Sequence, residues 1–171
     1  KVTQDIVYFL RFAINPNDAK AFMQIYYKCG YGFRQQTANW CCRKARNKGI
    51  TIVDELINQM KKWPRLMQKA EDFRNNMKKI AQSKPHDAID LIRRNWYYDY
   101  AKENELDIGK TDILYSLAVR EETIIGFLQR LNQLPKLIEN YKCTDNNPII
   151  LSTIHSAKGL EFDTVYIIDV Y

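Results

Sequence analysis

Apolar residues recur at spacings of three and four along about the first 145 residues, which is the period of an amphipathic helix. The first such pattern, from Val2 to Ala13, predicts a helix that ends near Asn15, because Pro16 follows it. Further patterns predict helices over residues 34–47 and 51–62. We therefore expect a mainly α fold.

Residues that favour helix ends stand at several of the predicted boundaries. Asn17 or Asp18 is expected to cap the second helix, and Thr51, with an acidic residue three positions later, resembles a capping box. Gly49 suits the left-handed position that follows a helix. Pro135 is expected to open a last short helix, because proline is favoured in the first turn.

The pattern changes after Asn147. Residues 149–151 and 165–168 are short runs rich in β-branched residues, and both predict buried strands, with a polar connection over residues 152–163. Two strands lack the neighbours needed for a sheet of their own. The sequence therefore predicts a fragment, in which a helical region ends in a short two-strand piece of an α/β domain that a larger protein completes.

Charge is distributed unevenly along the chain. The net charge is +6, but residues 1–100 carry 19 basic and 9 acidic side chains, whereas residues 101–171 carry 7 and 11. Residues 28–48 contain no acidic side chain. This basic stretch indicates either a polyanion contact or a solvated helix face. Its cations are Lys28, Arg34, Arg43, Lys44, Arg46 and Lys48.

Composition excludes several classes of protein. A hydrophobic content of 46% argues against general disorder, and no apolar run is long enough to span a bilayer. The chain starts without the pattern of a secretion signal, so we expect a cytoplasmic protein with no membrane contact. The four cysteines lack the spacing of a zinc site, and we expect reduced structural thiols and no metal.

Residues 151–162 read L-S-T-I-H-S-A-K-G-L-E-F. This segment resembles motif V of the UvrD/Rep-type superfamily 1 DNA helicases, whose pattern T-x-H-x-A-K-G-L-E-F it matches throughout. The resemblance places the segment in the second RecA-like (2A) domain. It implies that Thr153 and His155 contact the backbone of single-stranded DNA, that His155 and Lys158 couple nucleotide state to DNA grip, and that Gly159 and Glu161 face ATP.

The resemblance extends upstream. Residues 1–15 resemble a flank of the 2A domain, residues 16–145 a helical 2B-like subdomain, and residues 146–171 the return to 2A. The segment around Gly30 and Gly32 is similar to the R-G-I-G-x-x-T turn with which the family contacts duplex DNA, although Cys29 replaces the arginine and Tyr31 the isoleucine. The implied duplex contacts are Lys28, Gly30, Gly32, Arg34, Thr37, Arg43, Lys44 and Arg46.

The whole protein would accordingly be an ATP-dependent 3′-to-5′ DNA helicase or translocase of repair, replication or recombination, with ATP and Mg²⁺ as cofactors. Its partners would be DNA and the remaining helicase domains. This chain lacks a G-x-x-x-x-G-K-[ST] loop, so we expect no ATPase or helicase activity from it and no cofactor bound to it alone. A helicase-nuclease parent is equally compatible with these residues.

A different class of function remains open. The helical region is alternatively a regulatory or protein-docking module that does not touch DNA. An aromatic cluster would either pack in the core or stack on a partner, and packing is favoured because most aromatic side chains in proteins pack in this way. The cluster consists of Trp96, Tyr97, Tyr98 and Tyr100. Steep salt dependence of binding would favour DNA over a protein partner.

Overall fold

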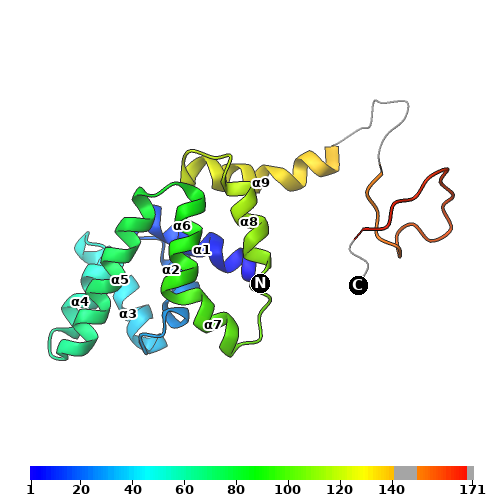
Figure 1. Ribbon diagram of the computed structural model, residues 1–171. Helices are drawn as coiled ribbons and strands as arrows, with labels where there is room; N and C mark the ends of the chain where they lie inside the picture. The colour runs from blue at the N-terminus through cyan, green and yellow to red at the C-terminus, as the bar shows by residue number, and fades with distance from the viewer. Residues whose placement is uncertain (141–149, 169–171) are drawn as a thin grey trace. The chain divides into compact units, whose positions relative to one another are not determined.

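The computed structural model describes residues 1–140 and 150–168, and the chain divides into two compact units, residues 1–135 and 136–171. The first unit is helical, as expected from the apolar periodicity. The elements are α1 (Val2–Ile14), α2 (Ala19–Ile25), the 3₁₀ turn η1 (Tyr26–Cys29), α3 (Gln35–Lys48), α4 (Ile52–Met60), α5 (Pro64–Gln82), α6 (Pro85–Ile92), the π-helical segment η2 (Arg93–Tyr97), α7 (Tyr98–Glu103), α8 (Lys110–Ala118) and α9 (Ile124–Asn140) (Figure 1).

Local side-chain chemistry sets several helix ends. Asp18 caps α2, because its Oδ1 accepts a hydrogen bond from the backbone N–H of Ala21 at 2.9 Å. Thr51 caps α4 in the same way, accepting from the N–H of Asp54 at 3.1 Å. Gly49 follows α3 with φ +66°, a conformation that glycine adopts without a steric penalty. These predicted boundaries are confirmed.

Pro135 does not open a new helix. It lies inside α9, which continues from Ile124 to Asn140, so the predicted break is wrong. A proline inside a helix removes one backbone donor and one hydrogen bond.

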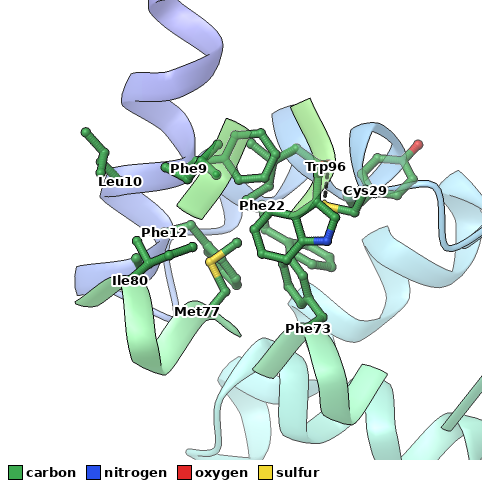
Figure 2. Close-up of a cluster of buried hydrophobic side chains, with 14 of the residues drawn as sticks. Phe9, Leu10, Phe12, Phe22, Cys29, Phe73, Met77, Ile80 and Trp96 are labelled. Atoms are coloured by element: carbon green, nitrogen blue, oxygen red, sulfur yellow. Dashed lines mark hydrogen bonds between the residues drawn. The ribbon is translucent and has the colours of Figure 1, made fainter. Parts of the chain in front are cut away.

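Aromatic rings form the centre of the first unit (Figure 2). Phe9 of α1 stacks on Trp96 of η2 with ring centroids 5.5 Å apart, and Phe73 of α5 lies at the same distance from Trp96. Phe12 and Phe22 join α1 to α2 at 5.2 Å. The prediction that this aromatic cluster packs is confirmed for Trp96 and Tyr97, which are both buried.

The predicted strands are not present in the part of residues 150–168 that the structure describes. This segment contains turns, and its apolar side chains are exposed, with Leu151 at 88% and Tyr166 at 87%. Ile149, in the first predicted strand, lies outside the described residues, as does the predicted domain boundary near residue 145. The fold is therefore mainly α, and the two-strand expectation fails because a short strand needs neighbours to pair with.

Candidate nucleic-acid interface

The turn between η1 and α3 presents two glycines to solvent. Gly30 has φ +66° and Gly32 has φ +73°, and a Cβ built on either residue would meet nothing within 4 Å. Both residues are exposed, whereas Cys29 and Phe33 on either side are buried. The turn therefore offers bare backbone on a fixed base, the arrangement that allows a phosphate to approach main-chain N–H groups.

Two side chains beside these glycines hold the turn. Tyr31 accepts a hydrogen bond from the indole N–H of Trp96 at 2.9 Å, and its ring packs edge-on against Phe73. Cys29 donates its thiol to the carbonyl of Ile25 at 3.4 Å, and burial raises the pKa of this thiol well above its usual value. Cys29 and Tyr31, two of the residues that differ from the R-G-I-G-x-x-T pattern, thus pack inward, whereas Tyr27, which stands at the position of the usual proline, is 47% exposed.

Helix α3 presents an acid-free basic face. Ala38, Cys41 and Ala45 are its buried side chains. Four cations of the basic stretch are exposed and have no carboxylate partner among the described residues: Arg34, Arg43, Lys44 and Arg46. At 100° per residue, Arg43 lies opposite the buried stripe, with Lys44 and Arg46 on either side of it. This face suits contact with a polyanion.

Trp40 is a further residue of this face that the sequence interpretation missed. Its ring is half-buried, and the ammonium of Lys44 lies 5.6 Å from the ring centroid. Such a contact fixes the cation near the helix surface. The spacing of four residues, which brings two side chains together on a helix, is the signal that identifies the pair.

Lys28 does not belong to this surface. Its side chain is only 2% exposed, and its ammonium pairs with Asp5 at 2.5 Å. Asp5 also accepts a hydrogen bond from the Tyr97 hydroxyl at 2.8 Å. The ammonium of Lys28 cannot contact a duplex from this position, so the prediction that Lys28 is a duplex contact is wrong. Lys48, the last cation of the stretch, pairs with the buried carboxylate of Glu55 at 2.7 Å.

The segment that resembles motif V forms a hydrogen-bonded turn. The Thr153 hydroxyl accepts from the N–H of Ser156 at 3.1 Å, and the Thr153 carbonyl accepts from the N–H of Ala157 at 2.9 Å. Gly159 then reverses the chain with φ +85°. Such a threonine-led turn followed by a left-handed glycine exposes the side chains that it carries.

The expected motif V side chains lie on this turn or, for Glu161, directly after it. All four of these side chains are exposed: Thr153, His155, Lys158 and Glu161. None of them forms an ion pair with another described residue. This segment therefore exposes a hydroxyl, an imidazole, an ammonium and a carboxylate within nine residues of sequence. Hydroxyl, imidazole and ammonium groups are suitable partners for phosphate oxygens.

A basic helix face beside an exposed glycine turn is typical of proteins that bind a polyanion such as nucleic acid. The comparison with family models agrees with that class, because residues 99–171 match the UvrD-like helicase C-terminal domain. This match supports a fragment of a UvrD-type helicase. No curated protein and no solved structure matches the chain significantly. Over the described ranges, no helix is both long and apolar enough to cross a membrane.

Proposed function

We propose that this chain is part of an ATP-dependent 3′-to-5′ DNA helicase or translocase and contributes DNA-binding surface to it. The observation that carries this proposal is the family match, whose range, 99–171, contains the whole pattern from Thr153 to Phe162. Within that pattern, Thr153 and His155 would contact the backbone of single-stranded DNA. His155 and Lys158 would relay nucleotide state to the DNA contact.

Gly159 and Glu161 would face ATP in the whole protein. The exposed carboxylate of Glu161 and the bare backbone at Gly159 suit a ribose and a phosphate respectively, but two residues do not make a nucleotide site. The sequence has no phosphate-binding G-x-x-x-x-G-K-[ST] loop. We therefore assign no hydrolytic step to this chain, and we expect no ATPase activity from it.

The duplex surface would consist of the glycine turn and helix α3. Exposed backbone at Gly30 and Gly32 would approach a phosphate, with Thr37 half-buried in the first turn of α3. The exposed cations Arg34, Arg43, Lys44 and Arg46 would neutralise neighbouring phosphates. The alternative, a protein-docking module, loses part of one support, because Trp96 and Tyr97 of the aromatic cluster are buried, whereas Tyr98 is 45% exposed.

Fluorescence anisotropy on a duplex with a 3′ single-stranded tail, repeated across a salt series, tests the duplex surface. The variant Arg43→Gln/Arg46→Gln is expected to bind about tenfold more weakly and to lower the slope of log K against log salt by about 1.8, since each phosphate contact contributes about 0.9. Lys20→Gln/Arg120→Gln, at two exposed positions on other parts of the surface, is the matched control.

Each outcome decides between the two functions. Salt-dependent binding that weakens in the α3 variant and not in the control supports the DNA surface. An unchanged salt slope in the α3 variant, or undetectable binding at low salt, overturns it. Binding to a protein partner that depends on apolar side chains and not on salt would then favour the docking module.

A further inference from the structure

The turn between α4 and α5 carries a second cluster of cations, centred on an exposed tryptophan. Trp63 is 55% exposed. Residues 58–70 contain four cations and no acidic side chain. All four, Lys61, Lys62, Arg65 and Lys69, are exposed, and the described part of the chain places no carboxylate within ion-pairing distance of them. We call residues 61–69 the tryptophan corner.

The backbone of Trp63 is firmly held. Its N–H donates to the carbonyl of Met60 at 2.8 Å, and its own carbonyl accepts from Leu66 at 3.0 Å and Met67 at 2.9 Å. Pro64 is the first residue of α5 and restricts the chain further. Leu66 and Met67 pack against the core. The indole is therefore presented to solvent from a rigid position.

Trp63 and Arg65 do not stabilise the start of α5. Trp63 occupies the N-cap position, where Ser, Thr, Asp or Asn would stabilise the helix, and no side chain caps α5. The first turn of α5 has no acidic residue and contains Arg65, so its charge opposes the helix dipole. The indole also has no aromatic or cationic partner within the described ranges. An exposed ring among unpaired cations points instead to a ligand with a flat π face and negative charge.

We propose that the tryptophan corner binds an unpaired nucleic-acid strand. The Trp63 ring would stack on one base, and the four cations would contact the phosphates on either side of it, as aromatic side chains in positive grooves do in proteins that bind single strands. The proposal rests on the nucleic-acid function proposed above. It concerns a surface outside both the range of the family match and the motif V turn.

The position of the tryptophan corner in the fold agrees with this role. Only Gly49, Ile50 and Thr51 connect α3 to α4, and the two helices pack against each other, so they run antiparallel. α4 leads directly into the tryptophan corner, and α3, α4 and α5 lie together at the lower left of Figure 1. One packed group of helices therefore carries both the duplex surface and the site for the unpaired strand.

Tryptophan fluorescence gives a direct test with a 15-nucleotide oligothymidylate as the probe. The chain has three tryptophans, of which Trp96 is 4% exposed and Trp40 half-buried, so Trp63 is the ring best placed to stack. The oligonucleotide is expected to quench the emission. Trp63→Ser is expected to abolish most of this quenching and to weaken binding, measured by anisotropy, about tenfold.

The serine variant keeps the test independent of folding. Serine is a favoured N-cap residue, so Trp63→Ser is expected to retain the wild-type urea unfolding midpoint or to raise it. Ile113→Ala, which removes apolar surface from a side chain that is 65% exposed, is the matched control and is expected to bind as the wild type does. Lys61→Gln/Lys62→Gln is expected to lower the salt slope by about 1.4, at about 0.7 per contact for a single strand.

The outcomes separate this inference from the proposed function. The proposal for the tryptophan corner is overturned if oligothymidylate does not quench the emission, or if Trp63→Ser binds oligothymidylate as tightly as the wild type. Either result counts even if the α3 variant loses duplex binding. If oligothymidylate quenches the wild-type emission but the α3 variant keeps the wild-type salt slope on the duplex, only the duplex surface is overturned. Phosphatidylserine vesicles that quench Trp63 when oligothymidylate does not would identify the tryptophan corner as a lipid site and also overturn the proposal.

Discussion

Asp5, Lys28 and Tyr97 form a buried polar group within the first unit. The ammonium of Lys28 lies 2.5 Å from one carboxylate oxygen of Asp5, and the Tyr97 hydroxyl lies 2.8 Å from the other. Lys28 also lies 5.2 Å from the centre of the Tyr27 ring. Each charge is satisfied, so removal of one member leaves another buried without its partner.

Lys28→Met is therefore expected to lower the free energy of unfolding by about 3–5 kcal/mol, because Asp5 stays buried and loses its counter-ion. Urea denaturation followed by circular dichroism measures this change. Asp5→Leu/Lys28→Met/Tyr97→Phe removes the three polar groups together and should recover most of the loss. A triple variant as unstable as Lys28→Met would contradict the interpretation.

Tyr97 makes stability depend on pH in the alkaline range. Burial, followed by the hydrogen bond to Asp5, raises the pKa of its hydroxyl above the usual value of 10.0. Above pH 10 the unfolded chain binds fewer protons than the folded chain, so the free energy of unfolding falls as pH rises.

Tyr97→Phe is expected to make this decline shallower above pH 10, by up to about 1.4 kcal/mol per pH unit, which is the contribution of one proton. Urea denaturation at several pH values measures the slope. Burial also raises the pKa of Tyr100, to about 12, so part of the decline should remain in the variant. If Tyr97→Phe leaves the slope of the unfolding free energy against pH unchanged, the Tyr97 hydroxyl has the same pKa in the folded and unfolded chain.

At the scale of elements, the glycine turn before α3 depends on backbone conformation and not on tight packing. Gly30 and Gly32 have positive φ, yet a Cβ on either would meet open space. A side chain there would cost conformational energy without a clash. Asparagine tolerates this region better than alanine or β-branched residues do.

Gly30→Ala is consequently expected to lower the free energy of unfolding by about 1–2 kcal/mol, and Gly30→Asn by less. Gly109→Ala is the control, because Gly109 has an ordinary φ of −56° and its Cβ would meet only the exposed side chain of Asp107. Thermal unfolding of the three variants gives the comparison. Equal losses for Gly30→Ala and Gly30→Asn would speak against the conformational explanation.

The sequence predicts the elements whose causes are local. Asp18, Thr51 and Gly49 each act within four residues of themselves, so their helix ends could be recognised directly. The burial of Lys28 could not, because its carboxylate partner lies 23 residues away and the Tyr97 hydroxyl that completes the group lies 92 residues from Asp5. The strand prediction failed for a related reason, since strands depend on neighbours beyond their own residues.

At the scale of the whole molecule, the two units differ in what they bury. Residues 1–135 contain the aromatic core, whereas the apolar side chains described in residues 150–168 are exposed, with Ile154 at 82% and Ile168 at 75%. Apolar surface that stays in water contributes nothing to folding by burial. Among the described residues, burial of apolar side chains therefore stabilises the first unit, and residues 150–168 add little to it.

The variant Leu151→Ser/Ile154→Ser/Val165→Ser is accordingly expected to change the free energy of unfolding by less than about 0.5 kcal/mol. It should also reduce the fluorescence of a bound apolar dye, because exposed apolar surface has been removed. Phe73→Ala, in the core, is the contrasting variant and should cost about 3–5 kcal/mol. A large loss of stability in the serine variant would show that residues 150–168 contribute buried apolar contacts.

The contact between Asp5 and Tyr97 also has a consequence for synthesis on the ribosome. The two residues are 92 positions apart, and Trp96, which stacks on Phe9, is likewise synthesised long after it. At about 5–20 residues per second, about 5–20 s pass between the synthesis of α1 and the synthesis of η2. During that interval Phe9 has no native partner in η2, so the part of α1 that packs on η2 stays exposed, and prone to aggregation, until η2 has been synthesised.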